Sequence, residues 1–252
     1  TDTGQTWTQQ YETQYPIRAV HFTSENTGVA VGSNNLALRT VNGGQTWETL
    51  STGDSGGLWD VAFDSEGQTG IIVGSDGGGS GELLRTVDGG QNWNSPVTPG
   101  KVLTAVAFAG QTQVHAVGVQ GIYMKSSDAG ASWTEQTIGS GEQLNKIEFT
   151  DTDNGMIVGS EGVIFTTTNA GADWQQKFTG SDNLLWDVSL TSPQNAVAVG
   201  NGGIILRTTD GGNFWQEEYS RTTDDIDAVH MIDADNGFAD GGFGTILKRG
   251  GQ

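Results

Sequence analysis

Residues 86–93 read Thr-Val-Asp-Gly-Gly-Gln-Asn-Trp, and a segment of this kind occurs six times among the 252 residues of the chain. In each copy a Trp follows five residues after an Asp or Asn: the pairs are Asp2 and Trp7, Asn42 and Trp47, Asp88 and Trp93, Asp128 and Trp133, Asn169 and Trp174, and Asp210 and Trp215. Successive Trp residues of these pairs are 40, 46, 40, 41 and 41 positions apart. This regular spacing predicts a protein built from six similar units.

Each unit contains three further stretches that have the pattern of β-strands. An alternating apolar stretch such as Val61-Ala62-Phe63 is followed by a run of small residues that ends in Val-Gly, such as Val73-Gly74. A third stretch then leads into the Asp- or Asn-containing segment, and the residues after the Trp form a fourth. Period-two alternation bounded by Gly, Asn and Asp is typical of strands joined by tight turns. Four strands in about 40 residues is the spacing of a propeller blade.

We therefore predict that residues 1–252 form a single all-β domain, a six-bladed β-propeller of four-stranded antiparallel blades. The first three strands of the last unit lie at the C-terminal end, whereas the first copy of the Trp-bearing strand lies at the N-terminal end. The N-terminal strand is thus expected to complete the last blade and close the ring in a 3+1 arrangement. Such a closure leaves no free sheet edge.

The repeated segments resemble Asp-box repeats, also called BNR repeats, whose pattern is Ser/Thr-x-Asp-x-Gly-x-Thr/Ser-Trp. Residues 86–93 and 126–133 follow this pattern with small departures. The whole unit resembles the photosystem II stability/assembly-factor-like propeller family over nearly the entire chain, and this resemblance favours a protein partner. In such repeats the Asp or Asn side chain holds the hairpin, Gly adopts a positive φ and Trp packs between blades. Asp-box propellers also occur in glycoside hydrolases and in sortilin-like receptors.

The charge balance excludes some classes of partner. The chain has 11 Lys and Arg against 30 Asp and Glu, a net charge of −19, so it lacks the basic stripe that binds nucleic-acid phosphates. No apolar run approaches the roughly 20 residues that span a bilayer, and the absence of cysteine excludes disulfides and thiolate metal sites. The acidic excess suits an exported protein, although net charge also serves solubility.

Two Trp residues lie outside the repeat and mark a candidate binding site. Trp59 and Trp186 begin the first strands of the second and fifth blades, which are opposite one another in a ring of six. Such positions border the mouth of the central channel, where exposed aromatic side chains stack on sugar rings or clasp a peptide. Equivalent or adjacent loops contribute Tyr15, Arg18, Asn145, Arg221, Asp227 and Phe243. The alternative is that both Trp residues pack between blades.

Five basic residues occupy one repeat position, just before the Asp-containing turn: Arg39, Arg85, Lys125, Arg207 and Lys248. Thr166 is the exception. One interpretation is a basic ring that docks an anion or a partner on the Asp-box face. The other is local pairing with carboxylates of the turns. Sixfold spacing keeps these side chains too far apart to form the converging arginine triad of a sialidase, and this excludes a sialidase.

Catalytic and metal sites have less support. Asp60 and Asp187 are candidates for the carboxylate pair of a glycoside hydrolase, but opposite blades are expected to hold them farther apart than that chemistry allows. His21 and His230 share a repeat position without a third metal ligand, so we expect structural histidines. The segments 151–155 and 233–237 resemble the start of a calcium loop, although ordinary turn chemistry also explains them. We expect no cofactor and no metal, with structural calcium as the open alternative.

The function predicted from the sequence is non-enzymatic. We expect a binding or scaffold propeller of an exported or cell-surface protein that engages a protein or a glycan at the channel mouth. The alternative is a carbohydrate-active enzyme that uses carboxylates and aromatic residues at the same face. Neither nucleic-acid binding nor membrane insertion is expected, and the propeller also suits a part of a larger surface protein or assembly.

Overall fold

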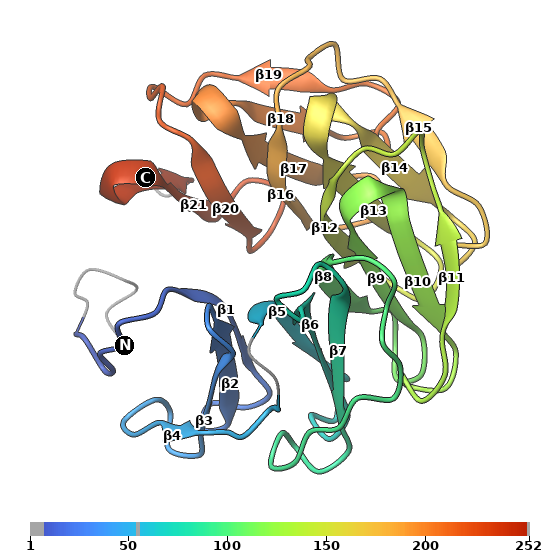
Figure 1. Cartoon of the computed structure of the whole chain (residues 1–252). Coiled ribbons are helices and arrows are strands. Elements are labelled where there is room, and N and C mark those ends of the chain that lie inside the picture. Colours follow the sequence, from blue (N-terminus) through green and yellow to red (C-terminus); the bar gives the residue numbers. More distant parts are fainter. Residues whose placement is uncertain (1–7, 54–55, 251–252) are drawn as a thin grey trace.

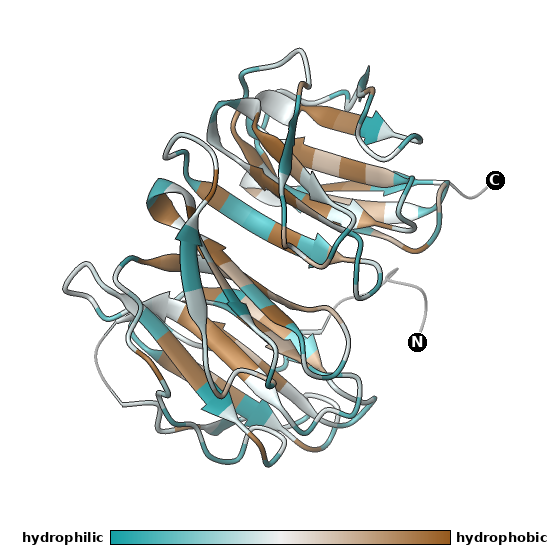
Figure 2. Ribbon diagram, turned by 90° about the vertical axis from the view of Figure 1, so that its right-hand side faces the viewer, coloured by the Kyte–Doolittle hydropathy of each residue, from teal (hydrophilic) through white to brown (hydrophobic). Residues whose placement is uncertain are grey.

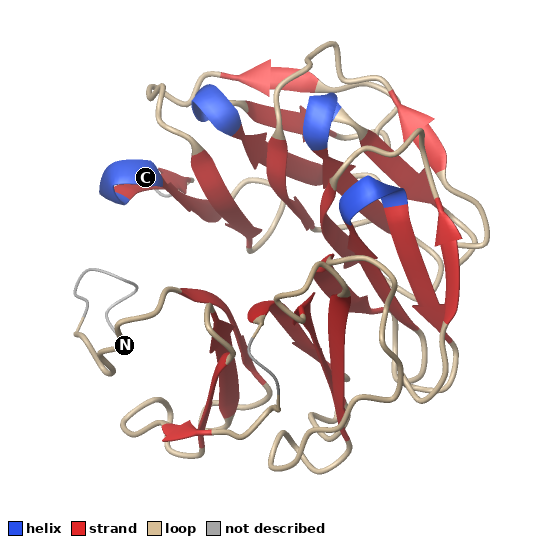
Figure 3. Ribbon diagram, viewed as in Figure 1, coloured by secondary structure: helices blue, strands red, loops and turns tan. Residues whose placement is uncertain are grey.

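A computed structural model describes residues 8–53 and 56–250 of the chain and shows six small antiparallel sheets around a central axis (Figure 1). The predicted all-β, six-bladed propeller is thereby confirmed. Figure 3 shows strands in every blade; among the described residues, single-turn helices occur only in the connections between second and third strands of blades 3 to 6. Within the described ranges, no helix has the length and hydrophobicity needed to cross a membrane.

In each blade the strands follow one another from the axis outward in chain order. Blades 1 to 3 consist of β1 (Ile17–Phe22), β2 (Gly28–Gly32), β3 (Leu36–Thr40) and β4 (Glu48–Thr49); β5 (Gly57–Phe63), β6 (Gly70–Ser75) and β7 (Gly81–Thr86); and β8 (Leu103–Phe108), β9 (Val114–Gly118), η1 (Val119–Gly121), β10 (Ile122–Ser126) and β11 (Thr134–Thr137). Blade 4 consists of β12 (Leu144–Phe149), β13 (Gly155–Gly159), η2 (Ser160–Gly162), β14 (Ile164–Thr167) and β15 (Gln175–Lys177). Blades 5 and 6 consist of β16 (Leu185–Leu190), β17 (Ala196–Gly200), η3 (Asn201–Gly203), β18 (Ile205–Thr208) and β19 (Gln216–Glu218); and β20 (Ile226–Met231), β21 (Gly237–Gly241), η4 (Gly242–Gly244) and β22 (Thr245–Arg249).

Two blades depart from the four-stranded pattern. In blade 2 the fourth strand is reduced to a single bridge between Arg85 and Asn94. Blade 6 has three strands within the described residues. The predicted closing strand begins in residues 1–7, which lie outside the described residues, and Thr8, Gln9 and Gln10 belong to no strand. Blades 1 and 6, which hold the two ends of the chain, face each other where the ring would close (Figure 1).

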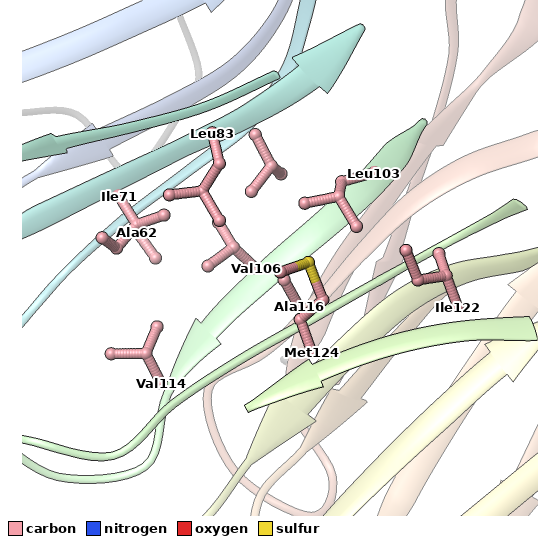
Figure 4. Packing of buried hydrophobic residues seen from close by; sticks show 10 residues of the cluster. Ala62, Ile71, Leu83, Leu103, Val106, Val114, Ala116, Ile122 and Met124 are labelled. Atoms are coloured by element: carbon pink, nitrogen blue, oxygen red, sulfur yellow. The ribbon is translucent and has the colours of Figure 1, made fainter. Parts of the chain in front are cut away.

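The core consists of apolar layers between neighbouring blades. Five clusters of buried residues are found among the described residues, one at each junction from blades 1 and 2 to blades 5 and 6. Figure 4 shows the layer between blades 2 and 3, where Ile71 and Leu83 meet Val106 and Met124. In Figure 2 the hydrophobic stretches lie mainly within strands of the blades, and several strands also carry hydrophilic stretches. Stacking of adjacent blades therefore provides the apolar burial that stabilises the ring.

A β-bulge lies at the start of the first strand of every blade. The pairing between first and second strands skips one residue there, as it does between Leu58 and Asp60 in blade 2. A glycine lies opposite each bulge, at the last or next-to-last position of the second strand, and a Cβ atom on Gly74 would overlap the carbonyl oxygen of Gly57. The repeated Val-Gly therefore reflects close backbone approach at the bulge.

Candidate functional site at the channel mouth

The six bulged residues form a ring around one cavity. They are Arg18, Trp59, Thr104, Asn145, Trp186 and Asp227, one from the first strand of each blade. The cavity has a volume of about 470 Å³ and is also lined by Pro16, Ile17 and Gln143. Because a bulge redirects the side chain of its extra residue, the same irregularity repeated six times directs six side chains to the channel mouth.

The structure brings together five of the eight candidate binding residues that were predicted from the sequence. Trp59, Trp186, Arg18 and Asp227 line the cavity, as does Asn145. The remaining three do not line it: Tyr15 precedes Pro16 in the chain, Arg221 lines a separate pocket between blades 5 and 6, and Phe243 is fully exposed in η4. Both Trp side chains are half-buried at the mouth.

Polar contacts fix the two Trp side chains. The guanidinium of Arg18 lies 4.3 Å from the ring centroid of Trp59, a cation–π contact. Arg18 Nε also donates to Ser33 Oγ at 3.3 Å. On the opposite side of the ring, Trp186 Nε1 donates to Asn201 Oδ1 at 2.6 Å. The mouth therefore carries two Trp side chains held in place by these contacts, and Asp227 and Arg18 lie between them in the order of the blades.

Two further members of the ring connect adjacent blades. Thr104 Oγ1 donates to the carbonyl oxygen of Leu144 at 2.5 Å, and Asn145 Nδ2 donates to that of Leu185 at 2.7 Å. These bonds hold blades 3, 4 and 5 in register at the mouth. Thr104 and Gln143 were not among the predicted residues, because a Thr or a Gln does not stand out in a chain of this composition.

A second cavity of about 430 Å³ lies deeper in the channel, lined by the next inward-facing residues of the first strands. Its charged and titratable members are His21, Asp60, Lys146, Glu148, Asp187 and His230. Asp60 accepts hydrogen bonds from the backbone NH groups of Val61 and of Val106 in the next blade, at 2.9 and 3.1 Å. Asp187 accepts from Val188 and Val229 in the same way, both at 2.9 Å. These two carboxylates therefore link adjacent blades.

Lys146 is the basic residue among three carboxylates. Its Nζ lies 3.5 Å from Asp60 Oδ2, and this carboxylate, with further help from Asp187 and Glu148, raises the pKa of Lys146 in spite of burial. Burial, together with the negative charge of Asp187, raises the pKa of Glu148 from 4.5 to about 8. Asp60 and Asp187 were candidates from the sequence, but Lys146 and Glu148 were not, because only the ring brings residues from blades 2, 4 and 5 together.

Replacement of Glu148 by Gln is expected to flatten the pH dependence of stability. Between about pH 4.5 and 8 the folded protein keeps a proton that the unfolded chain has released, so the free energy of unfolding falls as pH rises through this range. Gln removes the titration and should reduce that decline by about 1 kcal/mol or more. Urea unfolding at pH 5, 6.5 and 8 measures the slope, with the exposed Glu161→Gln as the control. Equal slopes in both variants would contradict the assignment.

The Asp-containing turns lie at the ends of the third strands. In blade 2, Asp88 Oδ1 accepts from the NH groups of Gln91 and Asn92, both at 3.0 Å, and Trp93 Nε1 donates to the carbonyl oxygen of Gly90 at 3.1 Å. Burial opposes ionisation of Asp88, but hydrogen bonds from Asn92 and its neighbours lower its pKa to about 2. These turns are hydrogen-bonded units with their carboxylates ionised.

Most of the predicted basic ring is engaged in contacts between blades. Arg39, Arg85 and Lys125 donate to the carbonyl oxygens of Gly89, Ala129 and Ala170 in the next blade, at 2.9, 2.8 and 2.6 Å. Arg207 donates to that of Ala234 at 3.0 Å, and Lys248 lies 5.8 Å from the ring of Phe238. Arg207 also lies 3.5 Å from Asp235 Oδ1 and 3.8 Å from Glu218 Oε1. Arg39, Arg85 and Lys125 thus donate to backbone carbonyls of the next blade, whereas Arg207 pairs with local carboxylates as well.

The segments considered for calcium form hydrogen-bonded turns. Asp151 Oδ1 accepts from the NH groups of Asp153 and Asn154, both at 2.8 Å, and Asp233 Oδ1 accepts from Asp235 and Asn236 at 2.8 and 2.9 Å. Across residues 8–53 and 56–250, no three His, Cys, Asp or Glu side chains are placed to hold a metal ion.

His21, one of the two histidines that share a repeat position, lies beside Phe63, with ring centroids 5.6 Å apart.

Comparison with known proteins agrees with the repeat pattern. Residues 1–98 and 95–179 match the family described as photosynthesis system II assembly factor YCF48. The chain belongs to this family. The resemblance predicted from the repeats is thereby confirmed. No curated protein matches the chain.

Solved structures similar to this chain include two of YCF48. One, described as YCF48 bound to D1 peptide, is 21% identical with a TM-score of 0.53, and the match covers 96% of both chains. YCF48 from Cyanidioschyzon merolae is 18% identical with a TM-score of 0.58, over 95% of this chain and 96% of that one. The GH74 enzyme of Niastella koreensis is 13% identical with a TM-score of 0.75, over 92% of this chain and 44% of that one. At these identities the likeness shows the propeller fold alone.

Proposed function

We propose that this protein is a non-enzymatic binding propeller that engages a polypeptide segment of a partner protein at the channel mouth. The observation that carries the proposal is the ring of bulged residues, which gathers Trp59, Trp186, Arg18 and Asp227 around one cavity. Fixed aromatic side chains supply apolar contact area at low entropic cost. The Arg and the Asp offer both signs of charge to the polar groups of a peptide. A family relative described as bound to a peptide adds support.

The alternative, a carbohydrate-active enzyme, has less support. Its candidate carboxylates, Asp60 and Asp187, each accept one backbone hydrogen bond from their own strand and one from the next blade, so their oxygens already have structural roles. Glycoside hydrolysis requires one carboxylic acid and one carboxylate free to reach the scissile bond. Export or display at the cell surface remains part of the proposal, supported by the net charge of −19.

The double variant Trp59→Ala/Trp186→Ala is expected to bind peptide at least about tenfold more weakly than the wild type. Peptides are first selected on the wild-type protein from a displayed random library, and affinities of the synthetic peptides are then measured by calorimetry. Phe178→Ala/Tyr219→Ala removes two exposed aromatic side chains outside the mouth cavity and is the matched control.

The same titrations with soluble oligosaccharides test the alternative. Peptide binding by the wild type and the control, with loss in the mouth variant, supports the proposal. Equal peptide affinity in the mouth variant and the control contradicts it. Binding of an oligosaccharide in place of any peptide would favour the carbohydrate-active alternative.

A further inference from the structure

The junction between blades 4 and 5 differs from those before it. At the junctions after blades 1, 2 and 3, a basic side chain of the third strand donates to the carbonyl oxygen of the second residue of the next blade's Asp-containing turn. In blade 4 the basic residue is replaced by Thr166. The corresponding carbonyl is that of Gly211, which accepts no hydrogen bond from the part of the chain that the structure describes.

The backbone at Gly211 has the same geometry as its three counterparts. The φ angles of Gly89, Ala129, Ala170 and Gly211 are 67°, 56°, 58° and 72°. In each case the backbone NH donates to the turn between the first and second strands of its own blade, at 3.0, 2.8, 3.0 and 3.0 Å respectively. A Cβ atom on the next residue, Gly212, would lie 3.3 Å from Cγ2 of Thr166. The carbonyl of Gly211 thus occupies the position that accepts a cationic donor at the other junctions.

A cavity of about 310 Å³ lies where the longer side chain would extend. Its lining includes Thr166 and Gly211, together with the acidic residues Asp173 and Asp210. Hydrogen bonds from the NH of Phe214 and from Thr208 lower the pKa of Asp210, which is therefore ionised at neutral pH. Lys177 also lines the cavity, but its Nζ donates to Asn213 Oδ1 at 2.9 Å. An acceptor carbonyl and two acidic side chains together favour a cationic group.

The geometry points to this pocket as a binding site for the guanidinium group of an arginine side chain presented by a partner polypeptide. Arginine suits the site better than lysine, because its planar guanidinium carries five NH donors. It can donate hydrogen bonds to the carbonyl of Gly211 and to a carboxylate at the same time. The chain itself places arginine at this contact after blades 1 and 2. This pocket is separate from the channel mouth, so the inference stands independently of the function proposed there.

The probe is the capped peptide acetyl-Gly-Arg-Gly-amide. Its binding is monitored through the backbone amide NMR signals of Gly211 and Gly212 during a titration. We expect saturable shifts of these signals with the arginine peptide, and at least tenfold weaker binding of the peptide that carries neutral citrulline instead. Absence of saturable shifts, or equal binding of the citrulline peptide, would overturn the inference. Tighter binding of free arginine than of the capped peptide would overturn the inference that the arginine belongs to a polypeptide. These measurements require only the wild-type protein.

A variant of the protein tests the same pocket by placing an arginine side chain of the chain itself in competition with the peptide. Thr166→Arg should restore the contact seen after blades 1 and 2 and lower the affinity for the arginine peptide at least tenfold. Thr137→Arg makes the same substitution at an exposed position of β11 and should bind as the wild type does. Wild-type affinity in a folded Thr166→Arg protein would contradict the assigned pocket.

Discussion

Gly200→Ala is expected to lower the free energy of unfolding by about 3 kcal/mol or more. Gly200 ends β17 opposite the bulge of blade 5, and a Cβ atom there would overlap the carbonyl oxygen of Leu184. The overlap involves backbone on both sides, so rotation of a side chain cannot relieve it. Either the bulge moves, and Trp186 with it, or the two strands separate. Chemical denaturation of both proteins measures the difference.

Gly100→Ala is the matched control, because no atom lies within 4 Å of a Cβ atom built there and its φ is not in the left-handed region. This substitution should change stability by less than about 0.5 kcal/mol or raise it slightly, since alanine restricts the unfolded chain. Equal losses in the two variants would show that the glycine opposite the bulge is not required for close backbone approach.

Lys146→Met is expected to lower the free energy of unfolding by about 2 kcal/mol and the melting temperature by roughly 4–8 °C. Removal of the ammonium leaves the carboxylates of Asp60 and Asp187 without the cation that balances them in the channel. Loss of one partner of a fully buried pair costs about 3–5 kcal/mol. The side chain of Lys146 is 34% exposed to the channel, and this reduces the expected effect.

Thermal unfolding at pH 7 tests this prediction, with Lys101→Met as the control. Lys101 Nζ donates to a backbone carbonyl, that of Gln120, at 3.5 Å. The control should unfold within about 2 °C of the wild type. A melting temperature for Lys146→Met equal to that of the control would contradict the role of Lys146 in neutralising the channel.

The fold was predictable from the sequence because the determinants of each blade are local. The Asp, Gly and Trp of a turn hydrogen-bond within a few residues of one another, as Asp88, Gly90 and Trp93 do, so their spacing carries the repeat. The glycine at the end of the second strand was visible as a repeated Val-Gly. The reason for this glycine was not visible in the sequence, because the bulge that the glycine accommodates belongs to a different strand.

The candidate site was predictable only in part. Trp59 and Trp186 stood out because they interrupt a regular pattern, and both line the mouth. Thr104 lines it equally, but its role depends on a hydrogen bond to Leu144, 40 residues away. In the same way, Thr166 was recognisable as an exception to the basic ring, whereas the cavity beside it depends on the packing of two blades.

The most direct test of binding at the channel mouth uses the indole NH signals of the protein. The chain has 8 Trp residues, six in the repeat and two at the mouth, so the repeat residues serve as an internal control. Titration with the library-derived peptide should shift the signals of Trp59 and Trp186 saturably and leave the described repeat residues, such as Trp93 and Trp133, unchanged. Shifts confined to the repeat residues would contradict binding at the mouth.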